Sequence, residues 1–238
     1  VEEPNVVWVG GGEADGGITY GKVFGNNDGS TTWYDAEHSW WLDMVSAIWG
    51  TGTCDKWMGG PAISGSMQTL YHWDCVELTN AYLGGGYEHV TGIHGTGPED
   101  VWAVLDFNLN NAYHSDGVGW ALLRETWMDQ ALYDVWVAYD GQAWAVGANG
   151  AIYHWSGIAW DDQSISGETR TIYGIWGFST GDIYAVGAEG LFYHYGGSWE
   201  DISIPGISTE SFFAVWGKIA PKYIYAVGTN GTTIRYSP

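Results

Sequence analysis

The fold is decided by residues 175–199, which read IWGFSTGDIYAVGAEGLFYHYGGSW. The short runs of aromatic and β-branched residues in this stretch, each closed by glycine or by polar residues, are typical of β-strands joined by tight turns. Nearly the same pattern returns at residues 215–236, which begin VWG, continue with YIYAVG and end with TIRY. Because the pattern recurs after about 40 residues, the chain is predicted to be a repeat protein.

Four predicted strands, a to d, can be followed through the whole chain by one marker residue each. The strand a markers are Trp49, His94, Trp136, Trp176 and Trp216, and the strand b markers are Trp8, Trp57, Trp102, Trp144, Tyr184 and Tyr225. The strand c markers are Thr19, His72, His114, His154, His194 and Arg235, and the strand d markers are Trp33, Leu78, Trp120, Trp160 and Trp199. Each d marker precedes the next a marker by 16 residues, or by 17 in the last case. Such a constant spacing predicts that all copies share one structure.

Repeats of about 40 residues with four strands each predict an all-β protein, a β-propeller. The markers give six b and six c strands but only five a and five d strands, hence 22 strands. We therefore predict a six-bladed propeller with a three-stranded blade at each end of the chain; five blades with a spare hairpin are the alternative. The predicted single domain spans 1–238, with blades at about 1–40, 41–85, 86–127, 128–167, 168–206 and 207–238.

Composition restricts the partners of the chain. Seven Lys and Arg residues against 28 Asp and Glu give a formal charge of −21, which argues against binding nucleic acid or an anionic membrane surface. Glycans, cations and basic proteins remain as partners. No run of about 18 apolar residues is present, and the chain starts with Val, so we expect any signal peptide to have been removed.

The two cysteines, Cys54 and Cys75, lie just before strand b and just after strand c of the second blade. The expected b–c register places Cys54 opposite Asp74, beside Cys75, so a disulfide that closes the hairpin is predicted; two free thiols are the alternative. A disulfide predicts a protein that works outside the cytoplasm, in the extracellular space or the cell envelope. Two cysteines without a Cys-x-x-Cys motif do not indicate zinc.

Most of the recurrent residues are predicted to serve the scaffold. Fourteen of the 17 Trp occupy repeat positions, where large flat side chains fill the space between blades. The strand c histidines stand on different sheets, which does not suit one shared metal centre, so we expect them to form structural hydrogen bonds. No metal or cofactor is predicted, although calcium at the acidic loops is kept as an alternative.

Residues that the repeat does not explain are the candidates for function. Trp40 and Trp127 occupy one position of the d–a connection, where other blades have a turn glycine. Residues 41–43, WLD, also resemble residues 127–129, WMD, with an offset of one. Blade two also carries an insertion, residues 61–67, in its b–c connection. Both connections emerge on one face of a propeller. The predicted ligand-binding residues on this face are Trp40, Trp41, Asp43, Ser64, Ser66, Trp127 and Asp129.

Exposed Trp beside carboxylates and hydroxyls suits stacking on a sugar ring, with hydrogen bonds to its hydroxyl groups. We therefore predict a non-catalytic, lectin-like extracellular module. The alternatives are a protein-binding or structural part of a cell-surface assembly, a carbohydrate-active enzyme, and tryptophans that merely cover blade edges. No nucleophile elbow, zinc-binding helix motif or phosphate loop indicates an enzyme.

The repeat motifs, with IWG, DIYAVG and YHY in this order, resemble those of secreted or lipid-anchored bacterial β-propellers. They are more distantly similar to Asp-box propellers and to photosystem II assembly factor propellers. Residues 27–33, NDGSTTW, and residues 115–120, SDGVGW, match the Asp box only in part, because a glycine is misplaced. Sialidase activity is not implied, since the catalytic Arg cluster of that family cannot be built from Arg124, Arg170 and Arg235.

Overall fold

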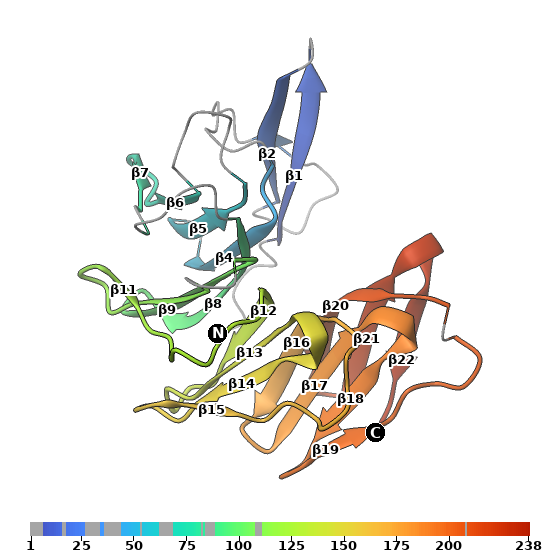
Figure 1. Cartoon of the computed structure of the whole chain (residues 1–238). Coiled ribbons are helices and arrows are strands. Elements are labelled where there is room, and N and C mark those ends of the chain that lie inside the picture. Colours follow the sequence, from blue (N-terminus) through green and yellow to red (C-terminus); the bar gives the residue numbers. More distant parts are fainter. Residues whose placement is uncertain are drawn as a thin grey trace. The chain divides into compact units, whose positions relative to one another are not determined.

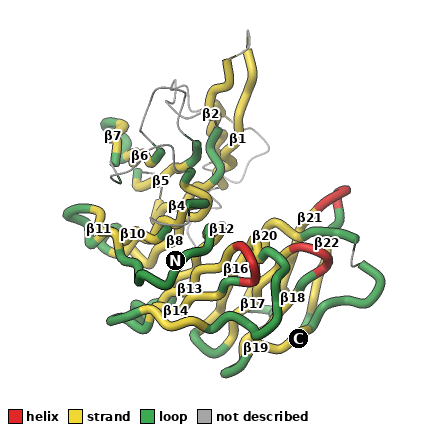
Figure 2. The backbone as a smooth tube through the Cα atoms, viewed as in Figure 1, coloured by secondary structure: helices red, strands yellow, loops and turns green. Residues whose placement is uncertain are grey.

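The computed structural model describes residues 7–15, 18–26, 34–35, 44–52, 54–61, 69–81, 83, 89–107, 111–207 and 209–238. Within these ranges the chain forms 22 β-strands, and its only helical segments are three short 3-10 turns, η1 (Ala148–Gly150), η2 (Ala188–Gly190) and η3 (Thr229–Gly231) (Figure 2). The prediction of an all-β protein is confirmed.

The strands form six antiparallel sheets, and each sheet follows the order of the chain (Figure 1). The first compact unit, Val1–Leu123, contains three sheets. They comprise β1 (Val7–Asp15), β2 (Ile18–Asn26) and β3 (Tyr34–Asp35); β4 (Ala47–Gly52), β5 (Asp55–Gly59), β6 (Leu70–Trp73) and β7 (Leu78–Asn80); and β8 (Val90–Gly97), β9 (Asp100–Leu105), β10 (Ala112–Ser115) and β11 (Trp120–Leu122).

The second compact unit, Arg124–Pro238, contains the other three sheets. They comprise β12 (Leu132–Val137), β13 (Ala143–Gly147), β14 (Ile152–Trp155) and β15 (Trp160–Asp162); β16 (Ile172–Ser179), β17 (Asp182–Gly187), β18 (Phe192–Tyr195) and β19 (Trp199–Asp201); and β20 (Phe212–Lys218), β21 (Tyr223–Gly228) and β22 (Thr233–Tyr236). The first and last sheets have three strands and the other four have four strands, as the markers predict. The six-bladed ring, like the single domain, stays a prediction.

The predicted markers align across the sheets. In the fourth sheet Trp136 pairs with Trp144, which pairs with His154, while Trp155 pairs with the d marker Trp160. The corresponding a, b and c markers pair in the second, third, fifth and sixth sheets as well. The repeat thus fixes the register of these sheets because a shift by one residue would turn every apolar side chain to the opposite face.

The first sheet is the exception, and there the assignment of Thr19 as a marker is wrong. Trp8 pairs with Gly25, and Thr19 pairs with Ala14. Only two residues, Gly16 and Gly17, separate β1 from β2 in the sequence. A two-residue connection sets the register of a hairpin from its turn, which overrides the register of the other repeats.

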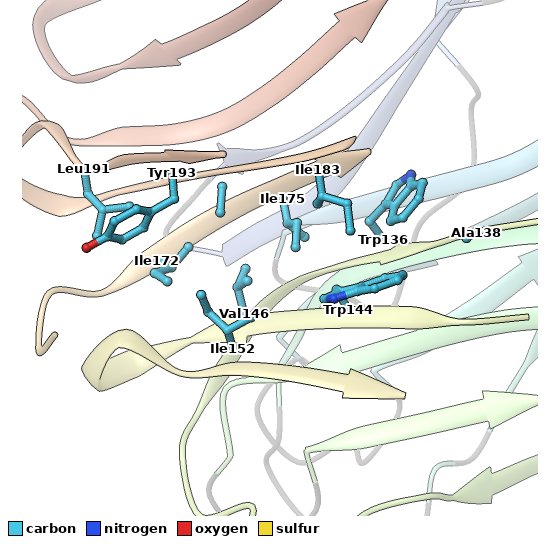
Figure 3. Close-up of a cluster of buried hydrophobic side chains, with 11 residues drawn as sticks. Trp136, Ala138, Trp144, Val146, Ile152, Ile172, Ile175, Ile183, Leu191 and Tyr193 are labelled. Carbon is cyan, nitrogen blue, oxygen red and sulfur yellow. The ribbon is translucent and has the colours of Figure 1, made fainter. Parts of the chain in front are cut away.

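The core of the second unit lies between neighbouring sheets (Figure 3). Trp136 and Trp144 of the fourth sheet pack with Ile175 and Ile183 of the fifth, and each of these side chains is at most 5% exposed. The bulky side chains of one sheet fill the space in front of the next, as expected for the repeated tryptophans. Burial of such large aromatic groups dominates the stability of a core.

The strand c histidines form structural hydrogen bonds, as predicted. Three of them bind the aspartate that starts strand b, with Nε2 to Oδ1 distances of 2.7 Å for His72 and Asp55, 3.0 Å for His114 and Asp100, and 3.1 Å for His194 and Asp182. His154 binds Gln142 Oε1 at 2.8 Å and Asp161 at 2.9 Å instead. Each imidazole also packs on the strand b aromatic ring, with centroids 4.3–4.7 Å apart.

Cys54 and Cys75 form a disulfide, with Cα atoms 4.7 Å apart, so this prediction is confirmed. The predicted register was wrong by one residue. Lys56 pairs with Trp73, and the same register continued by two residues places Cys54 opposite Cys75 itself and not opposite Asp74. The bond is in keeping with an oxidising environment. Within the described ranges, no helix is long and apolar enough to cross a membrane.

Candidate functional site

Two of the predicted ligand-binding residues, Trp127 and Asp129, lie in the described part of the chain, in the connection that leads into β12. Trp40, Trp41, Asp43, Ser64 and Ser66 lie outside the described residues. The geometry of the site is therefore built from the second unit alone.

Trp127 lies in a tight turn and is exposed, whereas the next residue, Met128, is buried. The backbone N–H of Met128 donates to the carbonyl of Glu125 at 3.1 Å, and the Met128 side chain is fully buried. The turn leaves the Trp127 side chain on the outside, where it is 42% exposed. The buried methionine anchors the connection, so the tryptophan is not needed as its anchor.

Trp127 is nevertheless held in place. Its ring meets the ring of Tyr153, from β14, edge to face, with centroids 5.4 Å apart and planes at 85°. Such a contact contributes roughly 0.5–1.5 kcal/mol beyond simple burial. A ring that is fixed on one side and open to solvent on the other loses little freedom when a ligand stacks on it.

A chain of hydrogen bonds fixes the carboxylate of Asp129. The side-chain amide of Asn149 donates to Gln130 Oε1 at 2.6 Å, and the amide of Gln130 donates to Asp129 Oδ1 at 2.7 Å. Asn149 lies in η1 with φ of 53°, a left-handed conformation that Asn tolerates better than most residues. The amides orient Asp129, whose carboxylate is exposed and can accept further hydrogen bonds.

The hydroxyl group of Tyr153 lies among negative charges. Burial, followed by the charges of Asp129 and Asp162, raises the pKa of Tyr153 to about 12. The hydroxyl group is therefore protonated at neutral pH, but Tyr153 is only 3% exposed, so its ring serves as the support of Trp127. We name the set of Trp127, Asp129, Gln130, Asn149 and Tyr153 the Trp127 corner.

The Trp127 corner combines the exposed aromatic face of Trp127, the exposed carboxylate of Asp129 and the exposed amide of Asn149. This combination offers stacking on an apolar face together with both donors and acceptors for hydroxyl groups. Sequence reasoning missed Gln130, Asn149 and Tyr153. Tyr153 could not stand out, because Tyr113 and Tyr193 occupy the same position in other sheets.

A second group of aromatic residues lies on β12, β16 and β20, the first strands of the three sheets of the second unit. The ring centroids of Tyr133 and Tyr173 are 5.5 Å apart, and those of Tyr173 and Phe213 are 5.3 Å apart. Phe213 is 53% exposed, and both tyrosines are partly exposed. We name these three residues the aromatic row. Among the residues described, no group of three or more His, Cys, Asp or Glu that could hold a metal ion is found.

No protein-family model matches the chain, and no curated protein matches it. Solved structures do resemble it. YCF48 bound to a D1 peptide is similar with a TM-score of 0.58 at 12% identity, covering 100% of this chain and 96% of that one. YCF48 from Cyanidioschyzon merolae has a TM-score of 0.63 at 12% identity, with 92% and 79% covered. Virginiamycin B lyase from Staphylococcus aureus has a TM-score of 0.66 at 12% identity, with 98% and 88% covered.

These similarities show the fold alone, because the identities are so low. They place the chain among β-propeller proteins, and the similarity to the photosystem II assembly factor propellers is thereby supported at the level of the fold. The same fold carries both YCF48 and an enzyme, so it does not decide between binding and catalysis.

Proposed function

We propose that the protein is a non-catalytic recognition module of the extracellular space or cell envelope that binds a glycan at the Trp127 corner. The observation that carries this proposal is a tryptophan that is 42% exposed yet fixed against Tyr153, next to an oriented carboxylate. A sugar ring would stack on Trp127 and donate hydroxyl hydrogens to Asp129. Trp40, Trp41, Asp43, Ser64 and Ser66 belong to the first unit and lie outside the described residues, so their part in glycan binding stays a prediction from the sequence.

A glycan array tests this proposal, with the wild-type protein and the variant Trp127→Gly side by side. Glycine is the residue that the repeat itself places at this position, as Gly167 and Gly206. We expect the wild type to bind a limited set of glycans and the variant to lose most of this binding. Failure of the wild type to bind any glycan, or an unchanged pattern for the variant, would contradict the proposal.

A polypeptide partner is the second candidate function, and the aromatic row favours it. Tyr and Phe are enriched in protein interfaces, and these three side chains form a continuous set on adjacent strands. The fold also accommodates this role, because the structurally similar YCF48 has been captured with a D1 peptide bound. An enzyme stays an alternative, because the structurally similar virginiamycin B lyase has the same fold. No set of residues described above supports a catalytic site.

A further inference from the structure

The aromatic row is created by three equivalent β-bulges. In each sheet of the second unit, the hydrogen-bonded ladder between the first two strands is interrupted. The interruptions lie between Leu132 and Asp134, between Ile172 and Gly174, and between Phe212 and Ala214. The skipped residues are Tyr133, Tyr173 and Phe213. A bulge re-aims the side chain of the extra residue, and bulges occur often beside functional sites.

The scaffold needs the bulge but not an aromatic residue in it. In the first unit, β8 has the same bulge between Val90 and Gly92, and the skipped residue there is Thr91. The hydroxyl of Thr91 donates to the carbonyl of Val104 at 3.0 Å. A small polar residue therefore satisfies the position, and the aromatic side chains of the second unit serve some other purpose.

The spacing of the row is fixed by contacts between the strands. β12 contacts β16, and β16 contacts β20 (Figure 1). Beside Tyr133, the carboxylate of Asp134 accepts hydrogen bonds from the backbone N–H of Ile175 and from that of Val135, both at 2.9 Å. Asp134 thus ties β12 to β16, and the aromatic faces are presented on a rigid support.

The charge of the second unit indicates what such a surface would bind. Residues 124–238 contain twelve Asp and Glu but only five Lys and Arg. Four of the five cations are engaged within the unit: Arg170 with Glu168, Lys222 with Asp182, Arg235 over the ring of Tyr223, and Arg124 with the carbonyl of Glu125. Excess negative charge together with aromatic faces attracts cationic groups.

We propose that the aromatic row is a binding surface for an extended polypeptide that carries Lys or Arg side chains. The cationic groups would lie over the faces of Tyr173 and Phe213, within the field of the acidic unit. This inference rests on the second candidate function, a polypeptide partner, and does not depend on glycan binding at the Trp127 corner. It adds the surface and the chemistry of the partner.

The test is a titration of the whole protein with two synthetic ten-residue peptides, one alternating Lys with Ser and one alternating Gln with Ser. The binding variant is Tyr173→Thr combined with Phe213→Thr, which copies the bulge residue of β8. Tyr139→Thr is the matched control, because Tyr139 is 97% exposed, lies elsewhere in the unit and has no part in either proposed site. Thermal unfolding of each variant verifies that it is folded.

We expect the Lys peptide to bind at least about tenfold more tightly than the Gln peptide, with affinity falling as salt is added. The double variant should bind the Lys peptide about five- to tenfold more weakly, the scale of one or two cation–π contacts, and Tyr139→Thr should leave its affinity unchanged. Equal binding of the Lys peptide by wild type and double variant would show that the aromatic row is not the binding surface. Equal affinity for both peptides would show that the surface does not recognise cationic side chains.

A library of random-sequence peptides tests the polypeptide partner separately from the binding of cationic peptides at the aromatic row. If neither designed peptide binds but the library yields binders, the aromatic row does not bind cationic peptides, while the proposal of a polypeptide partner is kept. If the library yields none, both the row and the second candidate function are contradicted.

Discussion

Two corners of the second unit occupy the same position in neighbouring sheets and are built differently. The Trp127 corner lies beside Tyr153. The other corner, which we name the Glu168 corner, consists of Glu168, Arg170 and Tyr193, and Tyr193 is the counterpart of Tyr153. Both connections contain a tight turn that ends at a residue with a buried side chain. The backbone N–H of Met128 donates to the carbonyl of Glu125, and that of Glu168 donates to the carbonyl of Ile165.

The Glu168 corner satisfies its own polar groups. Glu168 Oε2 accepts from Arg170 Nη2 at 2.6 Å and from the hydroxyl of Tyr193 at 2.6 Å, and its side chain is only 7% exposed. At the position of Trp127 it has Gly167. The comparison teaches that the scaffold does not need an aromatic residue at this position, and that the Trp127 corner leaves Trp127 and Asp129 open to solvent.

The largest expected effect comes from the core that both corners share. Trp144 is 1% exposed and packs with residues of the fourth and fifth sheets. Trp144→Ala should lower the free energy of unfolding by about 3–5 kcal/mol because of the cavity that it leaves. Denaturant unfolding measures this value, which sets the scale for a purely structural tryptophan. A cost below about 1 kcal/mol would show that the repeat tryptophans do not carry the core. Trp176→Ala should lower the free energy of unfolding by less than Trp144→Ala, because Trp176 is only partly buried.

Breaking the Glu168 corner should have the next largest effect. Glu168→Gln removes a charged partner of Arg170 and Tyr193, and we expect a loss of about 2 kcal/mol in the free energy of unfolding at neutral pH. The hydrogen bond from Arg170 is the main reason why the pKa of Glu168 falls to about 2.

The pH dependence of this variant follows from the lowered pKa. The ionised Glu168 stabilises the folded state above a pH of about 4.5, and this contribution is lost as pH falls towards 2. The difference in stability between wild type and Glu168→Gln should therefore shrink between pH 4.5 and pH 2. A difference that stays constant over this range would show that the ion pair does not stabilise the corner.

A smaller effect is expected at Gly167. Its φ of 85° is a left-handed conformation that residues with a Cβ rarely adopt, and an added Cβ would meet nothing within 4 Å. Gly167→Ala should therefore cost about 1 kcal/mol of unfolding free energy through backbone strain alone. Thermal unfolding can measure this. An unchanged melting temperature would mean that the glycine is not required by the turn.

The sequence predicted the parts of the fold that repeat. Markers such as Trp144 and His154 recur at constant spacing, so their pairing in the sheets followed directly. The first sheet was predicted in the wrong register because the hairpin before Thr19 overrides the repeat. Closure of the propeller could not be predicted from spacing alone, since it depends on how sheets distant in the sequence pack.

The candidate site was predicted only where it departs from the repeat. Trp127 and Asp129 stood out against the glycines of other blades. Asn149 reaches Gln130 across 19 residues, through a turn whose left-handed backbone the sequence does not reveal. The aromatic row was missed for the opposite reason. Tyr133 and Tyr173 recur like scaffold residues, and the bulges in which they lie are visible only in the structure.

The central claim is that Trp127 serves binding while the repeat tryptophans serve the fold. The most direct test measures two quantities on the single variant Trp127→Ala: its free energy of unfolding and its affinity for a glycan that the wild type binds. We predict a loss of stability of about 1.5 kcal/mol or less, the scale of its contact with Tyr153 and well below that of Trp144→Ala, and a loss of binding of roughly 1–3 kcal/mol. If Trp127→Ala instead destabilises the fold as much as Trp144→Ala and leaves glycan affinity unchanged, Trp127 is a packing residue and the claim is wrong.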